Sequence, residues 1–290
     1  MNFGIIGRII RESDKELIQK LFKWMDREGI KFLVENSLIE KLGNNEFSDK
    51  GVESNELVKR SDMILALGGD GGILSTAKVV GKEMVPILGV NTGRLGFLAE
   101  IDIQELIDNI KILSEKKFHI EKRMILAGTI PSNDSGKKIY GLNDIVVNKG
   151  SYSRTIVLEL FIGDKYFNTY TADGLIIATP TGSTAYSLSA GGPILSPNVE
   201  GIIINPICPH SLTERPVIIP SESIISIKLK TEIDHVKIFA DGQIGFNLKP
   251  EQKLEVKKGE YLVNLVHCGK KSFYDILRTK LNWGRRGVET

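Results

Sequence analysis

The sequence predicts an α/β, Rossmann-like N-terminal domain followed by a mostly β C-terminal sandwich domain. Strand and helix signals alternate over roughly the first hundred residues, and short strand-like runs without helical periodicity follow from about residue 120. The 290 residues have room for about two domains of about 150 residues each. We expect the domains at residues 1–118 and 119–267, with residues 268–290 as a C-terminal segment that returns toward the first domain.

The N-terminal elements follow from the spacing of apolar residues. Strands are expected at residues 3–7, 31–34, 63–67 and 85–90, and helices at residues 17–25, 73–80 and 103–113. Ser13 with Glu16, and Asp102 with Glu105, have the spacing of helix-capping pairs. Such alternation is typical of a parallel sheet covered by helices. Residues 36–55 are polar and are expected to form a mobile loop.

The second half is rich in Val, Ile, Thr and aromatic residues, with Gly, Pro, Asn and Asp in the gaps. Strands are expected at residues 124–130, 145–148, 156–162, 175–179, 217–219, 224–229, 236–240 and 261–266. Short strands of this kind indicate a β-sandwich. We expect the active site between the two domains, because ligand sites often lie at domain interfaces.

The composition excludes several classes of protein. Hydrophobic residues make up 41% and charged residues 26%, as in an ordinary soluble globular protein. The 38 basic and 36 acidic residues leave a net charge of +2, which gives no reason to expect a nucleic-acid or membrane partner. No apolar stretch approaches the roughly 20 residues of a membrane span, and no signal peptide is recognisable, so we expect a cytoplasmic protein.

A glycine-rich loop follows the strand expected at residues 63–67. Its sequence is Gly68-Gly69-Asp70-Gly71-Gly72, and a helix is expected directly after it. Glycines allow backbone N–H groups to approach an anion, and a helix N-terminus adds partial positive charge, so the arrangement predicts phosphate binding. It is neither a Walker loop nor a Rossmann fingerprint. The alternative is a tight turn in which Asp70 only caps the helix.

Asp70 favours a kinase over a passive phosphate binder. A carboxylate among phosphate-binding N–H groups would repel phosphate, so its presence suggests that it handles a proton or a magnesium ion. A second glycine cluster, residues 89–98, follows another strand of the same sheet. Because ligands bind at the carboxyl ends of such strands, we expect the two loops to lie together. The alternative is that these glycines only serve packing.

The third candidate segment is residues 173–193. Seven hydroxyl-bearing residues lie between Thr179 and Ser189. Hydroxyl groups bind phosphates and sugars, and Tyr186 could stack on a base or bond a ribose. The alternative is a turn-rich loop whose hydroxyls bond their own backbone.

Together these motifs resemble the NAD kinase family, and they occur in the family's order. They are Gly68-Gly69-Asp70-Gly71, residues 91–98, Asn143-Asp144, Asp173-Gly174, residues 180–187, residues 208–212 and Asp241-Gly242-Gln243. The resemblance covers about residues 63–243, and residues 277–283 also match. The Gly-Gly-Asp-Gly element is shared with diacylglycerol kinases, sphingosine kinases and phosphofructokinases, whereas residues 180–187 beside Asn143-Asp144 are specific.

The resemblance implies transfer of the γ-phosphoryl group of ATP, or of a phosphoryl group of polyphosphate, to the 2′-hydroxyl of the adenosine ribose of NAD. The product is NADP, and Asp70 is the implied proton acceptor. The implied phosphate loop consists of Gly68, Gly69, Gly71 and Gly72. The implied NAD contacts are Gly71, Asn143, Asp144, Asp173, Thr184, Ala185, Tyr186, Ser187, Ser189 and Gln243. Arg154 could supply positive charge for the pyrophosphate, or it could be a solvated loop arginine.

Two positions depart from the family pattern. Gly72 stands where relatives often have a hydroxyl or amide side chain, and Thr171 stands where many have Arg or Lys, which weakens the expected pyrophosphate contacts. The resemblance implies Mg²⁺ with ATP, without a metal site of protein side chains, and a homodimer or homotetramer. Two rival functions stay open: a lipid or sugar kinase with the same glycine loop, and a non-catalytic NAD-binding sensor.

Overall fold

A computed structural model of the chain describes residues 1–7, 12–43, 45–93, 96–115, 117–130, 136–233, 236–268 and 272–283. Contacts between Cα atoms divide the chain into two compact units. Unit 1 contains residues 1–122 and 263–290, and unit 2 contains residues 123–262. The chain therefore leaves unit 1 and returns to it near its C-terminus.

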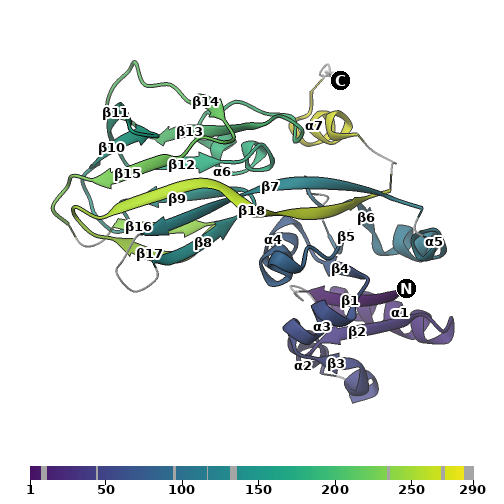
Figure 1. The fold of residues 1–290 in the computed structure, drawn as a ribbon. Coiled ribbons are helices and arrows are strands. Elements are labelled where there is room, and N and C mark those ends of the chain that lie inside the picture. The colour runs from purple at the N-terminus through teal and green to yellow at the C-terminus, as the bar shows by residue number, and fades with distance from the viewer. Residues whose placement is uncertain are drawn as a thin grey trace. The chain divides into compact units, whose positions relative to one another are not determined.

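Unit 1 contains a parallel sheet in the order β5-β4-β1-β2-β3, with β6 paired to β5 (Figure 1). All these neighbours pair in parallel. The strands are β1 (Asn2–Gly7), β2 (Lys31–Glu35), β3 (Gly51–Val52), β4 (Met63–Leu67), β5 (Ile87–Asn91) and β6 (Ile101–Asp102). The helices are α1 (Glu12–Arg27), α2 (Asn36–Leu42), α3 (Ser54–Arg60), α4 (Asp70–Val80), α5 (Ile103–Ser114) and α7 (Phe273–Leu281), with short 3₁₀ helices η1 (Asn45–Lys50) and η2 (Gly81–Glu83).

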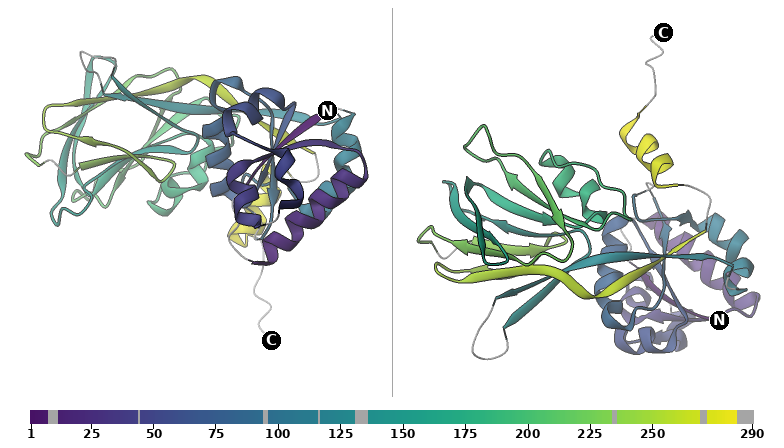
Figure 2. Two further views of the ribbon diagram at one scale, coloured as in Figure 1. Left: turned by 90° about the horizontal axis from the view of Figure 1, so that it is seen from below. Right: turned by 45° about the horizontal axis from the view of Figure 1, so that its top comes forward.

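Helices contact both faces of this sheet (Figure 2). Side chains of α1 and α5 form one apolar cluster with Phe3 and Ile5 of β1. On the other face, α3 and α4 contact each other and β1, and a Cβ atom at Gly4 of β1 would meet the side chain of Leu57 in α3. Every residue of β4 is buried, as expected for a strand covered on both faces. The predicted α/β domain is confirmed.

The capping interaction predicted for the helix after β6 is confirmed. The N–H of Glu105 donates to Asp102 Oδ1 at 2.8 Å, and the N–H of Asp102 donates to Glu105 Oε2 at 3.0 Å. The side chain of Ser13, which was predicted to cap the first helix, lies outside the described part of the chain. Helix α1 already includes Glu12, one residue before that predicted cap.

The prediction of a loop over residues 36–55 is wrong. The segment contains α2, η1, β3 and the start of α3. Leu38, Leu42 and Phe47 are buried in the core of unit 1, so three well-spaced apolar side chains anchor an otherwise polar segment. The Oγ of Ser54 also donates to Glu35 Oε1 at 2.6 Å. Tertiary contacts of this kind are not evident in local composition.

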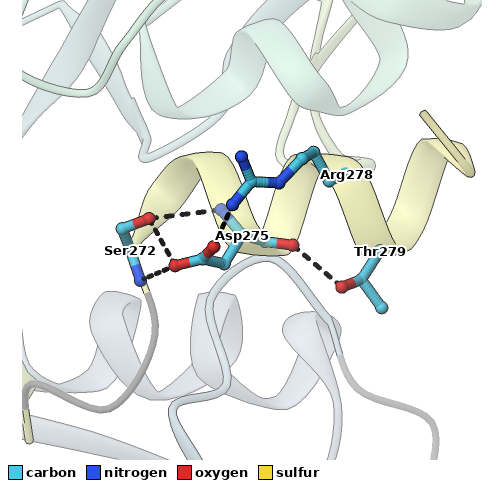
Figure 3. Close-up of polar contacts among 4 residues, drawn as sticks. All are labelled: Ser272, Asp275, Arg278 and Thr279. Atoms are coloured by element: carbon cyan, nitrogen blue, oxygen red, sulfur yellow. Dashed lines mark hydrogen bonds and ion pairs between the residues drawn. The ribbon is translucent and has the colours of Figure 1, made fainter. Parts of the chain in front are cut away.

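The C-terminal segment contains a helix, α7, with a capping box at its start. The N–H of Asp275 donates to Ser272 Oγ at 3.2 Å, and the N–H of Ser272 donates to Asp275 Oδ2 at 3.0 Å; Figure 3 marks both contacts with dashed lines. Arg278 forms an ion pair with Asp275, and Thr279 Oγ1 donates to the carbonyl oxygen of Asp275 at 2.8 Å. This helix was not predicted from the sequence.

Unit 2 is built from two sheets. The first has the order β14-β13-β12-β9-β16-β17, and its neighbours pair antiparallel. Its strands are β9 (Asp144–Asn148), β12 (Gly174–Ala178), β13 (Gly201–Ile207), β14 (Val217–Pro220), β16 (Val236–Ala240) and β17 (Gln243–Leu248). The second has the order β11-β10-β15-β18-β7-β8. Its strands are β7 (His119–Ile130), β8 (Lys137–Gly141), β10 (Ile156–Ile162), β11 (Lys165–Ala172), β15 (Ile225–Leu229) and β18 (Lys253–His267), and β7 and β18 also contribute residues to unit 1.

The core of unit 2 contains side chains from both sheets, so the predicted sandwich is confirmed. Ile177 of β12 belongs to this core, together with Leu158 of β10 and Ile227 of β15. Ile176, the neighbour of Ile177 in the chain, lies in a separate small cluster with Leu195. Strand β12 is therefore buried on both faces, and it leads into the short helices η3 (Thr181–Thr184) and α6 (Tyr186–Ser189). Among the described residues, no helix is long and apolar enough to span a membrane.

Candidate active site

The glycine loop after β4 is a tight turn that leads into α4. Gly68 has a φ of 140°, which residues with a Cβ rarely adopt, and its N–H donates to the carbonyl oxygen of Val90 at 2.9 Å. Gly69 is the N-cap residue of α4, and the helix begins at Asp70. The structure therefore has the predicted sequence of strand, glycine loop and helix, with a helix N-terminus at the loop.

Asp70 joins the two glycine clusters. Its Oδ2 accepts a hydrogen bond from the N–H of Phe97 at 2.8 Å, and its Oδ1 accepts one from the N–H of Leu98 at 2.9 Å. A Cβ atom at Gly96 would overlap Oδ1 of Asp70. Asp70 is thus not the capping residue of α4, and its side chain is held in one orientation by the second loop. The structure brings these loops together as expected, while Arg94 and Leu95 lie outside the described residues.

The glycine loop also lies at a favourable place in the topology of unit 1. The sheet extends from β1 to β2 on one side and to β4 on the other, so the strand order reverses beside β1. Ligands of open α/β sheets bind outside the carboxyl ends of the strands at such a reversal. Because the loop begins at the carboxyl end of β4, the N–H groups of its middle residues are suitably placed for an anion, whereas those of Gly68 and Gly72 donate to backbone carbonyl oxygens.

In unit 2, the segment around Asn143 contacts the loop that follows β12. The N–H of Thr179 donates to the carbonyl oxygen of Asn143 at 2.8 Å, and Thr179 Oγ1 donates to the carbonyl oxygen of Leu142 at 2.6 Å. A Cβ atom at Gly182 would overlap the backbone of Asn143. Two motifs that lie far apart in the sequence are therefore in direct contact.

Asp144 is a buried carboxyl group next to a second one. Its side chain is 4% exposed. Burial, and to a smaller extent the negative charge of Asp241, raise the pKa of Asp144 to about 7. Asp144 therefore keeps its proton to a higher pH than an ordinary surface aspartate. Perturbed carboxyl groups of this kind are frequent at functional sites.

The hydroxyl groups after β12 fall into two classes. Ser183 and Ser187 are buried, and both bond within the fold: Ser183 Oγ donates to Pro180 O at 2.6 Å, and Asn205 Nδ2 donates to Ser187 Oγ at 3.3 Å. Thr184 Oγ1 donates to the carbonyl oxygen of Thr181 at 3.2 Å. The side chain of Tyr186 is 44% exposed, and Ser189 is also exposed. In part of the loop, the hydroxyl groups therefore form hydrogen bonds with nearby backbone groups, as in the alternative given for this segment.

Tyr186 lies among ionisable groups. Partial burial raises the pKa of Tyr186, and the nearby Cys208, Asp144 and Asp173 add to this effect in that order. Tyr186 begins α6 and Asp144 begins β9, whereas Cys208 directly follows β13 and Asp173 directly precedes β12. The structure therefore gathers three residues of the predicted NAD site, Asp144, Asp173 and Tyr186.

Asp173 is paired with Lys149, a residue for which the sequence predicted no role. Lys149 Nζ lies 2.6 Å from Asp173 Oδ1, and the side chains are 22% and 32% exposed respectively. The backbone is fixed as well, because the N–H of Lys149 donates to the carbonyl oxygen of Asp173 at 3.0 Å. Lys149 therefore places a positive charge directly beside Asp173. Only the pairing of β9 with β12 reveals this proximity.

The three remaining predicted residues are at least partly accessible to solvent. Arg154 is exposed in the loop after β9, and Ala185 and Gln243 are half-buried. A buried arginine was also missed: Arg123 is 9% exposed, and its Nη1 donates to Thr181 Oγ1 at 3.3 Å. Its place under the loop could not be predicted from its own segment of sequence.

Two family models match most of the chain. Residues 3–118 match the ATP-NAD kinase N-terminal domain, and residues 142–268 match the ATP-NAD kinase C-terminal domain. An NAD kinase of Caldanaerobacter subterraneus subsp. tengcongensis is 39% identical over 279 residues, which is 96% of this chain and 98% of the relative. An NAD kinase of Geobacter sulfurreducens is 40% identical over 286 residues, which is 98% and 99% of the two chains.

Solved structures show the same similarity. The yeast NADH kinase complexed with NADH has a TM-score of 0.88 and 28% identity, and the match covers 100% of this chain and 90% of the yeast protein. An NAD kinase from Archaeoglobus fulgidus in complex with ATP has a TM-score of 0.74 and 23% identity, with coverage of 97% and 99%. The second match speaks for the fold alone.

Proposed function

The chain belongs to the NAD kinase family, and from this premise we propose how its residues phosphorylate NAD. ATP is the phosphoryl donor, the 2′-hydroxyl of the adenosine ribose is the acceptor, and NADP is the product. The observation that carries the proposal is the carboxylate of Asp70, which two backbone N–H groups hold at the phosphate-binding loop. That placement suits a group that receives a proton during phosphoryl transfer.

The reaction balances with Asp70 as the proton acceptor. The 2′-oxygen forms a bond to the γ-phosphorus, and the bond from that phosphorus to the bridging oxygen of ADP breaks. The proton of the hydroxyl passes to Asp70. A carboxylate can accept roughly four hydrogen bonds, so the two N–H groups of Phe97 and Leu98 leave capacity for the ribose hydroxyl.

The NAD molecule is proposed to contact unit 2 through Asn143, Asp144, Asp173 and Tyr186. A ribose carries vicinal hydroxyl donors, and the carboxyl groups of Asp144 and Asp173 are suitable acceptors. The exposed ring of Tyr186 offers a stacking surface for a base. Ser187 supports the loop from within, since its hydroxyl already bonds to Asn205.

Magnesium is proposed to arrive with the phosphates of ATP. Among the described residues, no three His, Cys, Asp or Glu side chains are grouped to hold a metal ion. Mg²⁺ usually takes most of its ligands from substrate phosphates and water and only one or two from protein carboxylates. When bound, it neutralises charge on the transferring group. Asp70 is the carboxylate of the glycine loop that could contribute a ligand.

The decisive experiment is a coupled assay for NADP formation with purified protein, Mg²⁺ and a panel of donors and acceptors. We expect product with NAD and ATP. Activity with polyphosphate or with NADH would show that the enzyme also accepts this donor or this acceptor. Asp70→Asn should reduce kcat by about 10² to 10⁴, with a smaller change in NAD affinity. Tight binding of NAD without product for any donor would instead support the sensor, and phosphorylation of a lipid or sugar would support the other rival.

A homodimer or homotetramer in the cytoplasm is proposed as the working form. The surface of unit 2 carries exposed apolar side chains, including Leu212 at 91% and Ile218 at 49% exposure, that a second copy could cover. Light scattering of the purified protein gives the number of copies. A monomer at all concentrations would contradict this part of the proposal without affecting the reaction.

A further inference from the structure

Asp241 lies in the turn of the β16–β17 hairpin. Ala240 pairs with Gln243, so Asp241 and Gly242 form a two-residue turn. Their φ angles are 49° and 74°, as in a type I′ turn. Asn-Gly and Asp-Gly are both favoured in this turn. The turn itself therefore does not require an acidic residue.

The carboxylate of Asp241 binds three consecutive backbone N–H groups of the segment proposed to contact NAD. Oδ2 accepts from Leu142 at 2.8 Å, and Oδ1 accepts from Asn143 at 2.7 Å and from Asp144 at 3.2 Å. The N–H of Asp241 donates in return to the carbonyl oxygen of Asp144 at 3.1 Å. Hydrogen bonds to an ionised acceptor are about twice as strong as neutral ones.

The backbone of Gly141 lies so close to Asp144 and Asp241 that a side chain at position 141 would not fit without a shift. A Cβ atom at Gly141 would overlap the carbonyl oxygen of Asp144 and would lie 3.4 Å from Asp241 Oδ1. The segment is therefore folded tightly around the carboxylate. From the other side, Thr179 bonds to Leu142 and Asn143. Asn143 is held between the β16–β17 turn and the loop that follows β12.

We propose that Asp241 is a positioning residue for NAD binding, which holds the backbone of Leu142, Asn143 and Asp144 from the β16–β17 turn. The inference rests on the proposed role of Asn143 and Asp144 in binding NAD. It assigns to Asp241 a function beyond that of a turn residue. Asp241 itself need not touch the substrate.

The negative charge of Asp241 should affect how KM for NAD depends on pH, an effect that a purely structural role would not produce. Two ionisable groups lie near Asp144: Asp241 in the hairpin turn and Tyr186 in α6. Tyr186 also has Asp173 and Cys208 as neighbours. Tyr261 lies near Asp241. The negative charge of Asp241 contributes to the raised pKa of Asp144. Removing it lowers that pKa. If ionised Asp144 accepts a ribose hydroxyl, KM for NAD falls as Asp144 loses its proton.

The test is Asp241→Asn, which retains a good turn residue and the shape of the side chain. The amide offers one acceptor oxygen instead of two and turns an NH₂ group toward backbone donors. We expect KM for NAD to rise about tenfold, the size of one lost charge-assisted hydrogen bond, with kcat within about twofold. In wild type, KM for NAD should fall as pH rises through about 7, and in the variant this midpoint should move to lower pH.

The matched control is Asp164→Asn. Asp164 is an exposed residue in the two-residue turn between β10 and β11, where Ile162 pairs with Lys165. This variant should leave both the KM and its pH profile unchanged. Asp241→Gly keeps a backbone that tolerates positive φ but removes the carboxylate, and it should raise KM further than Asp241→Asn.

Wild-type KM and pH midpoint in a folded, active Asp241→Asn or Asp241→Gly variant would overturn the proposal. A fall of about tenfold in kcat with an unchanged KM for NAD would also overturn the proposal, because Asp241 would then act on the reacting groups and not on NAD binding. Failure of the proposed function is distinct, because wild type would then form no NADP at all.

Discussion

The backbone of Gly96 lies directly against the carboxylate of Asp70, so a Cβ atom at position 96 would overlap Asp70 Oδ1. The N–H groups of Phe97 and Leu98, the next two residues, bind the two oxygens of that carboxylate. The orientation of Asp70 therefore depends on a glycine in a different loop. This contact brings together two glycine clusters that are separated in sequence.

Gly96→Ala should displace the carboxylate of Asp70 while leaving the acid in place. A shift of about 1 Å in a reacting group can cost on the order of 10²-fold in rate, so we expect a fall of this order in kcat for NADP formation. Combining it with Asp70→Asn should add little, because both changes remove the same function. A Gly96→Ala enzyme with normal kcat would show that the orientation of Asp70 does not matter.

The Gly71→Ala variant tests whether the phosphates of ATP approach the backbone of Gly71. Among the described residues, no atom outside the adjacent residues and the surrounding helix backbone lies within 4 Å of a Cβ atom built at Gly71, the second residue of α4. The variant should be as stable as wild type or more stable by about 0.4–1 kcal/mol, measured by thermal unfolding. If phosphates approach this backbone, KM for ATP should rise severalfold. An unchanged KM for ATP with unchanged stability would place the phosphates elsewhere.

Lys149→Met should weaken NAD binding without unfolding the protein. Lys149 and Asp173 are both partly exposed, and such ion pairs contribute only about 0–1 kcal/mol to stability, so the unfolding temperature should change little. Losing the partner of Asp173 should raise KM for NAD, and Lys149→Arg should largely retain the wild-type value. Equal KM values for the Met variant and wild type would argue against a role of this pair in binding.

Asp144 should make the folded state less stable as pH rises. The pKa of Asp144 is about 7 in the folded protein, above its ordinary value of 3.8, so between these two values the folded state binds more protons than the unfolded state. The stabilisation is complete below about pH 4 and is lost as pH rises through about 7.

The measurement is the thermal unfolding temperature of Asp144→Asn and wild type at pH 5 and pH 8. The variant should gain stability relative to wild type at pH 8, because it avoids a buried charge next to Asp241. Asp164→Asn serves as the exposed control, without such a pH-dependent difference. A constant difference between Asp144→Asn and wild type at both pH values would contradict the raised pKa.

Several apolar strands could be predicted from the sequence, although β13, which is buried along its whole length, was not among the expected strands. Strands β4, β10 and β16 have the predicted bounds, because each is a run of apolar or alternating residues with turn signals at its ends. Strand β11 was missed because it is largely polar and exposed: only Tyr170 and Ala172 are buried. Its place depends on pairing with β10, which is a non-local contact.

The site could be predicted only as separate motifs. Asp70 was recognised from its glycine loop, and Asn143 and Asp173 were assigned from the resemblance to the NAD kinase family, but the residues that contact them could not be predicted. Phe97 contributes only a backbone N–H, and Lys149 becomes adjacent to Asp173 only through the register between β9 and β12. Asp241 was visible as part of an Asp-Gly turn, yet its bonds to Leu142, Asn143 and Asp144 span about a hundred positions of sequence.

Strand β12 has no exposed face, and this limits how the loop after it can evolve. Any change in the direction of that loop would require compensating changes in two hydrophobic clusters at once, those containing Ile177 and Ile176. Substitutions that change which acceptor molecule is preferred are therefore expected at positions such as Tyr186 and Ser189. The side chains of these two residues are exposed and can be replaced without repacking the core.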